Sequence, residues 1–90
     1  SASTLTVLVK DNDDVVTRLK EFLNESKVLI TALEYKHQMY EGEKVTKIVV
    51  VFGTPTLIIE LNEFLANLDK EFSPIQCKLS NETYVKNKRL

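Results

Sequence analysis

The stretch TLTVLVKDNDDVVTRLKEFL, residues 4–23, changes its hydrophobic period once, and that change predicts a strand followed by a helix. At the start of the stretch, Leu5, Val7 and Val9 alternate with the residues between them, which is typical of a strand with one buried face. Over residues 13–26 the apolar residues instead recur with the 3.6-residue spacing of an amphipathic helix. The first predicted unit is therefore β–α.

A long hairpin is predicted next. Residues 27–38, KVLITALEYKHQ, are rich in β-branched and aromatic side chains and indicate a second strand. Gly42 supplies the turn chemistry, and residues 45–52, VTKIVVVF, indicate the returning strand. The two strands are therefore expected to pair with each other.

A second helix and a last strand follow the hairpin. Thr54 is a plausible N-cap and Pro55 suits the first helical position, where its missing N–H is harmless. The Ser-Pro pair at residues 73–74 predicts the end of the helix, and residues 75–80 alternate as a strand. Residues 81–90 are polar and basic, and we expect them to extend that strand or to fray. The apolar stripe of the helix consists of Leu57, Ile58, Leu61, Leu65, Leu68 and Phe72.

The resulting order β-α-β-β-α-β predicts an α+β, ferredoxin-like βαββαβ sandwich, in which two helices cover one face of a four-stranded antiparallel sheet. We expect residues 1–90 to form a single domain, because a chain of 90 residues has room for one hydrophobic core. Alternation predicts that one set of strand residues points toward the helices: Leu5, Val7, Val9, Ile30, Ala32, Ile48, Val50 and Phe52. The opposite face would then carry an apolar patch made of Leu8, Leu33, Tyr35, Val49 and Val51.

The composition limits the classes of function. The chain has 12 basic and 13 acidic residues, so no whole-molecule field would steer it onto nucleic acid or anionic lipid. One cysteine, Cys77, excludes an intrachain disulfide and a cysteine metal cluster. No apolar run approaches the length of a membrane helix and no secretory signal is evident, so we expect a cytoplasmic location without membrane binding.

Residues 5–37, LTVLVKDNDDVVTRLKEFLNESKVLITALEYKH, resemble the ACT domain, a small regulatory module of amino-acid-metabolism enzymes and some transcription regulators. With the hairpin and the segment TPTLIIELNEFLANL, the resemblance spans residues 4–79. It implies the ferredoxin-like fold and a tendency to pair through sheets. Ligand-binding ACT domains have a glycine at the turn where Asp14 stands here, so the resemblance implies no ligand residues for this chain.

The acidic corner after the first strand has two interpretations. Asp11, Asn12, Asp13 and Asp14 offer oxygen ligands for a hard cation, but a calcium loop also needs a turn glycine and a distal carboxylate in register. The alternative, which we favour, is that one of these side chains caps the helix while the others favour the positive end of its dipole.

The remaining candidates for chemistry stand alone. His37 is expected in the exposed hairpin arm without a partner that would make it catalytic, and Cys77 alternates with core residues, which makes it a poor nucleophile. Gly42 and Gly53 are isolated, so no glycine-rich phosphate loop exists, and the chain has no GxSxG, HExxH or paired-cysteine motif. We therefore expect no catalytic residues, no metal and no cofactor, and a protein that is not an enzyme.

These observations favour a small regulatory or protein-interaction module that self-associates through its sheet into a homodimer or binds another protein. The predicted contact residues are Leu8, Leu33, Tyr35, Val49 and Val51 on the sheet and Met39 and Tyr40 on the hairpin arm. The simpler alternative is that these are strand-forming residues scattered among lysine stems.

A second hypothesis is a nucleic-acid-binding protein that uses the sheet face and a basic tail with Lys86, Lys88 and Arg89. Only Tyr35 would be available on that face to stack a base, which places this hypothesis second. A third is an accessory protein, of bacteriophage type, that modulates a larger machine.

Overall fold

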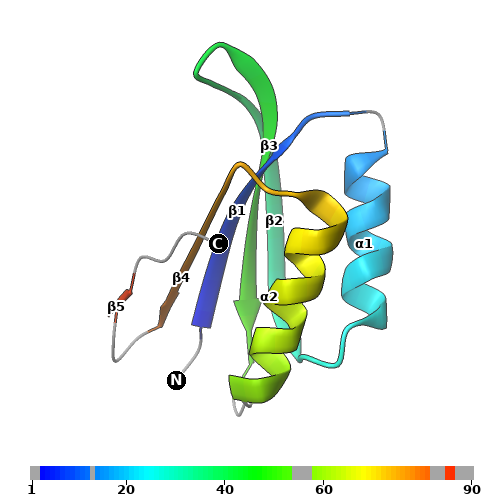
Figure 1. Ribbon diagram of the computed structural model, residues 1–90, viewed down its shortest axis with the longest axis vertical. Helices are drawn as coiled ribbons and strands as arrows, with labels where there is room; N and C mark the ends of the chain where they lie inside the picture. The colour runs from blue at the N-terminus through cyan, green and yellow to red at the C-terminus, as the bar shows by residue number, and fades with distance from the viewer. Residues whose placement is uncertain (1–2, 13, 54–57, 82–84, 87–90) are drawn as a thin grey trace.

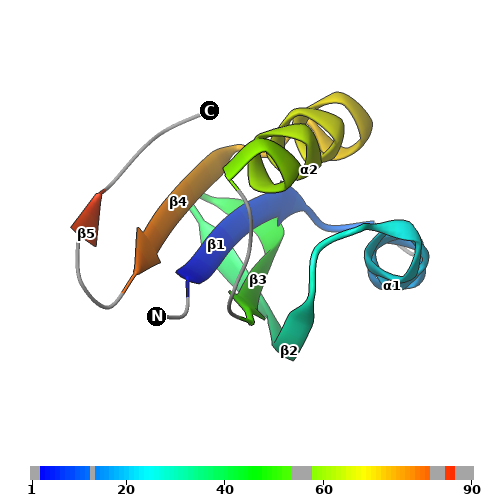
Figure 2. The same cartoon turned by 90° about the horizontal axis from the view of Figure 1, so that it is seen from below.

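The structure, a computed structural model, describes residues 3–12, 14–53, 58–81 and 85–86. Along the chain the elements are β1 (Ser3–Lys10), α1 (Val15–Glu25), β2 (Ile30–Tyr40), β3 (Glu43–Phe52), α2 (Ile58–Phe72), β4 (Gln76–Asn81) and β5 (Val85–Lys86). The strands form one antiparallel sheet in the order β2-β3-β1-β4-β5, and both helices lie on the same side of it (Figures 1 and 2). The predicted ferredoxin-like fold is confirmed, with the short β5 added beside β4.

The helices end where the sequence predicts. The N–H of Ser26 and its hydroxyl both donate to the carbonyl of Leu23, which closes α1. Ser73 adopts a positive φ of 45° and its N–H donates to the carbonyl of Asp69, so the Ser-Pro pair ends α2 as expected. Thr54, Pro55 and Leu57 lie outside the described residues. Neither described helix is both long and apolar enough to cross a membrane.

The β2–β3 hairpin is closed by a two-residue turn. Glu41 has a φ of 50° and Gly42 a φ of 82°, and positive φ at both central residues is the mark of the type I′ turn that suits two twisted strands. Tyr40 and Glu43 are consequently paired across the turn. The turn predicted at Gly42 is confirmed, and both strands extend further toward it than the sequence pattern indicated.

A β-bulge at the other end of the hairpin changes which side chains face the helices. The register of β2 against β3 shifts between Ile30 and Ala32. Beyond the shift Leu33 pairs with Val50 and Tyr35 pairs with Ile48, and Val50 and Ile48 are the residues of β3 that face the helices. The expectation that Leu33 and Tyr35 lie on the face opposite the helices, with Ala32 turned inward, is therefore wrong. One inserted residue reverses the two sides of a strand.

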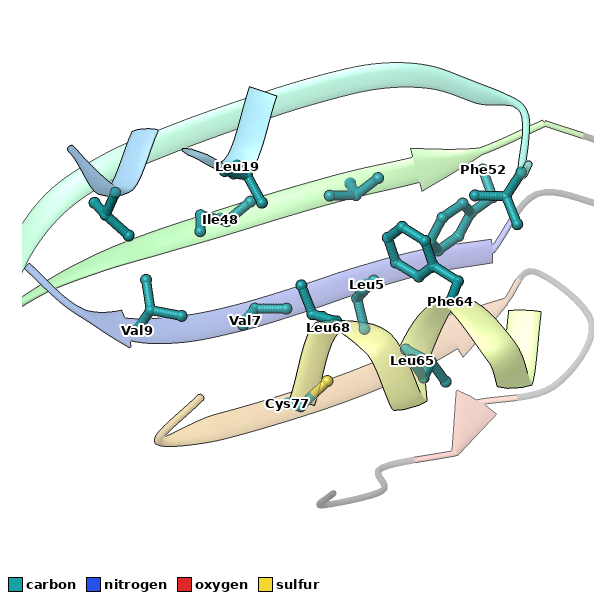
Figure 3. Packing of buried hydrophobic residues seen from close by; sticks show 13 residues of the cluster. Leu5, Val7, Val9, Leu19, Ile48, Phe52, Phe64, Leu65, Leu68 and Cys77 are labelled. Atoms are coloured by element: carbon teal, nitrogen blue, oxygen red, sulfur yellow. The ribbon is translucent and has the colours of Figure 1, made fainter. Parts of the chain in front are cut away.

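The core lies between the sheet and the helices. Phe64 of α2 points toward Phe52 of β3 in Figure 3, with ring centroids 5.2 Å apart, and its ring also lies 5.3 Å from that of Phe22 in α1. Phe64 was absent from the apolar stripe predicted for α2, although it is only 4% exposed. The buried cluster consists of Leu5, Val7, Val9, Val15, Leu19, Val28, Ile48, Val50, Phe52, Phe64, Leu65, Leu68 and Cys77.

Replacement of Phe64 by Ala should lower the free energy of unfolding by about 3–5 kcal/mol, because it removes a large buried ring that contacts both α1 and β3. Urea denaturation of the two proteins measures the difference. Phe72→Ala is the matched control, since Phe72 is only partly buried beside the core and should cost less. A smaller loss in Phe64→Ala than in Phe72→Ala would contradict the central place of Phe64 in the core.

Candidate interaction site

Strand β2 lies at one edge of the sheet and is eleven residues long. Only β3 pairs with it in the part of the chain that the structure describes, and Figure 2 shows its other side turned away from the remaining strands. Such an edge presents a row of backbone N–H and C=O groups that can pair with another strand. Tyr35 and Met39 stand on it as two of the most exposed large apolar side chains, at 45% and 60%.

The side chains of β2 divide between the two faces of the sheet. On the side of the helices, here called the helix face, Leu33 packs partly buried against the core. The Tyr35 ring meets the His37 ring edge-on at 6.0 Å, and Nζ of Lys20 from α1 lies 5.8 Å from the Tyr35 ring centre. Tyr35 is therefore a residue of the strand edge beside α1, and it does not join Val49 and Val51.

The other side of the sheet is here called the open face. Val49 and Val51 lie on this face, as predicted, and both are half-buried. Leu8 also points to it, between Lys47 and Gln76 in register, but it is only 6% exposed. Leu8 is therefore wrong as a surface contact residue. Of the predicted apolar patch, Val49 and Val51 are therefore the two residues that are both on this face and partly exposed.

A shallow hollow lies where the open face meets the strand edge. It has a volume of about 420 Å³. Its lining residues are Leu33, Glu34, Tyr35, Lys36, Lys47 and Val49.

The other predicted contact residues are placed as follows. Met39 is exposed and Tyr40 is half-buried at the end of β2, next to the hairpin turn. Lys86 belongs to β5, whereas Lys88 and Arg89 lie outside the described residues. The predicted contact residues of the hairpin arm therefore lie on the same strand edge as Tyr35. Two of the three basic residues predicted for the tail are outside the described part of the chain.

The acidic corner holds neither a cation cluster nor a capping carboxylate among the residues described there. Asp14 occupies the N-cap position of α1, but its side chain makes no capping hydrogen bond. Its N–H instead donates to Oδ1 of Asn12 at 3.3 Å, which forms a local turn. No group of three metal-ligating side chains occurs among the described residues, and Asp13 lies outside them. The side chain that caps the helix, predicted to be one of those at residues 11–14, is therefore not that of Asp14.

Asp11 has a different role, which the sequence analysis missed. The buried hydroxyl of Thr46 donates to Oδ1 of Asp11 at 3.0 Å, and Nδ1 of His37 lies 3.1 Å from the Thr46 oxygen and 3.3 Å from the same carboxylate oxygen. Because the Thr46 proton goes to Asp11, the Thr46 oxygen is free to accept from a protonated Nδ1. The three side chains join the end of β1 to β3 and β2.

The geometry of this cluster suits a structural role, in which it holds the strands together, better than a catalytic one. Thr46 is fully buried, so its hydroxyl is not accessible to a substrate, and it already donates to Asp11. His37 therefore does have a carboxylate beside it, contrary to expectation. The signal was present in the sequence, because a turn at residues 41–42 pairs His37 with Thr46, and Asp11 follows the strand that lies on the other side of Thr46.

Cys77 is buried on β4, as its alternation predicted. Burial, and to a smaller extent the nearby Asp69 carboxylate, raise the pKa of the Cys77 thiol from 9.0 to about 11. A thiol with such a pKa is a weak nucleophile at neutral pH.

Comparison with known proteins adds a likeness of fold. The sequence matches no protein-family model and no curated protein sequence. The structure is similar to the crystal structure of a formyltetrahydrofolate deformylase from Pseudomonas putida KT2440, with a TM-score of 0.64 and 16% sequence identity. The likeness covers 93% of this chain and 30% of that chain, so this chain spans less than a third of the length of that enzyme. It agrees with the ferredoxin-like fold.

Replacement of Thr46 by Val should lower the free energy of unfolding by about 1–2 kcal/mol, because the isosteric side chain removes the hydroxyl that bridges Asp11 and His37. Urea denaturation measures the change. Thr6→Val, at a partly buried position on the open face, is the control and should change stability by less. A Thr46→Val protein as stable as the parent would show that the cluster does not contribute to the stability of the fold.

Alkylation of Cys77 by iodoacetamide near pH 8 should be at least about 100-fold slower in the native protein than in urea, because the raised pKa alone lowers the thiolate fraction by that factor. Mass spectrometry follows the reaction. Similar rates in the native and unfolded states would contradict a buried thiol.

Proposed function

We propose that the protein is a small non-enzymatic interaction module of the ACT-like, regulatory kind, and that it self-associates by pairing β2 with β2 of a second copy. The observation that carries the proposal is the long β2 edge, whose outer side has no strand beside it in the described part of the chain. A second strand there would satisfy the backbone groups of both edges at once.

The geometry of such a pair limits its register. A two-fold axis perpendicular to the sheet makes the strands antiparallel and keeps the helices of both copies on one side. Side chains that meet must then belong to the same face, so the axis lies midway between the two copies of one β2 residue, here called the central residue of the pair. An axis at Glu34 would set two carboxylates opposite each other, and an axis at Lys36 would do the same with two ammonium groups.

An axis at Tyr35 gives the complementary arrangement. Glu34 and Lys36 both lie on the open face, because they pair with Val49 and Lys47 of β3. In this register Glu34 of each copy meets Lys36 of the other, which forms two cross-strand pairs of opposite charge. The two Tyr35 rings meet on the helix face. The sequence of β2 is thus self-complementary at its centre, and this supports a second copy as the occupant of the edge.

Pairing at the edge fits the structure better than burial of the open face. Of the predicted open-face patch, Leu8 is buried and Leu33 and Tyr35 belong to the helix face. The two remaining valines are already half-buried. The edge, in contrast, carries Tyr35 and Met39, both exposed. The self-association that we expected through the face of the sheet is therefore proposed through its edge.

Three further observations favour a non-enzymatic role. The Thr46 hydroxyl is buried and engaged, and the thiol of Cys77 is buried with a raised pKa. The structurally similar part of the deformylase is less than a third of that larger chain, which is compatible with a module that accompanies other domains or proteins.

Reversal of one charge in β2 should weaken the dimer. Glu34→Lys sets lysine against Lys36 of the other copy twice, and Lys36→Glu sets glutamate against Glu34 twice. Each change should raise the dissociation constant by about 10- to 100-fold, since two favourable cross-strand pairs become repulsive. Light-scattering mass over a range of protein concentrations measures the constant.

The matched control is the double variant Glu34→Lys with Lys36→Glu, which restores both opposite-charge pairs and should recover the dimer. Val49→Asp, on the open face, should leave the mass unchanged. If the dimer is lost in Val49→Asp but kept in both single charge variants, the dimer interface lies on the open face and not at the β2 edge. A parent protein that stays monomeric at all concentrations would refute self-association.

A further inference from the structure

The open face of the sheet is basic, although the whole chain has a formal charge of −1. Within the described ranges, the register places two carboxylates on this face, Glu34 and Glu43. Helices α1 and α2 carry the opposite imbalance, with six carboxylates against three basic side chains. Among the described residues, the open face is thus net positive and the two helices are net negative. The lysines of the open face are Lys10, Lys36, Lys47 and Lys78.

Two of these lysines are directly opposed. Lys36 of β2 pairs with Lys47 of β3 in register, and like charges in that arrangement destabilise a sheet. Neither side chain has an ion-pair partner among the residues that the structure describes. Lys47 is only half exposed, and both lysines line the shallow hollow described above. An anionic group between these two lysines would relieve their repulsion.

The other side chains of the open face indicate the kind of anion. Single-stranded nucleic acid binds to sheets largely by stacking its bases on aromatic rings. Among the described residues, the strands place one aromatic side chain on this face, Tyr40, and it stands next to the hairpin turn. Near the lysines the face instead carries Val49 and Val51, which offer aliphatic contact.

We propose that the open face binds an acidic segment of another protein, in which carboxylates contact Lys36, Lys47 and Lys78 and apolar side chains contact Val49 and Val51. The inference goes beyond the proposed self-association. It shares one residue with that proposal, Lys36 of β2, whereas Lys47 and Lys78 belong to β3 and β4, so substitutions at these two lysines test the open face without changing the edge strand.

The test is fluorescence anisotropy with a fluorescein-labelled peptide of glutamate and leucine, which is titrated with the full chain at low and at high salt. The parent protein should bind the peptide, and affinity should fall as salt rises because the contact is largely ionic. Lys47→Glu with Lys78→Glu should weaken binding by at least about tenfold. Lys47→Gln with Lys78→Gln should weaken it less, which keeps the result interpretable if the reversed variant unfolds.

The matched control is Lys27→Glu with Lys70→Glu, which makes the same charge change away from the open face and should leave the affinity within about twofold of the parent. Light-scattering mass of the Lys47→Glu, Lys78→Glu protein should equal that of the parent, which separates this result from any loss of self-association. The inference is overturned if the parent does not bind the peptide, or if the control variant loses as much affinity as the variant with Lys47→Glu and Lys78→Glu. It is also overturned if labelled oligothymidylate binds to the open face and the peptide does not.

Discussion

The register between β2 and β3 is the constraint on which the surfaces of this protein depend. The Glu41–Gly42 turn fixes it at one end, and the bulge after Ile30 shifts it by one residue at the other. Between these two points every side chain of β2 has an assigned face. The turn brings His37 beside Thr46, and the same register directs Leu33 toward the core and Glu34 and Lys36 to the open face. The bulge allows Ile30, on its other side, to pack against the core as well.

Two surfaces with different chemistry follow from this register. The edge of β2, which has no second strand beside it in the described part of the chain, has central charges that are self-complementary, which suits a second copy of the same chain. The open face offers lysines around two valines, which suits an acidic partner. Lys36 takes part in both surfaces, because it stands on the edge strand and also faces Lys47. Self-association and partner binding would therefore influence each other through this one side chain.

Much of the fold could be predicted from the sequence, because hydrophobic period and turn residues are local signals. The order of the elements, the turn at Gly42, the end of α2 at Ser73 and the burial of Cys77 were all predicted correctly. The bulge was missed because Thr31 is β-branched like Ile30 before it, so nothing in its residue type marks an inserted position. Apolar residues also follow it at both Ala32 and Leu33, so the hydrophobic pattern fits either register. The Asp11–Thr46–His37 cluster was missed because it joins three strands that only the tertiary pairing brings together.

The central claim is that the outer edge of β2 pairs with a second copy, and hydrogen–deuterium exchange measured at increasing protein concentration tests it most directly. The account predicts that β2 amides not bonded to β3 become protected as the concentration rises, while amides of the Glu41–Gly42 turn keep the same exchange rate. Exchange of the β2 amides that does not change with concentration, in a protein that nevertheless dimerises, would contradict pairing at this edge.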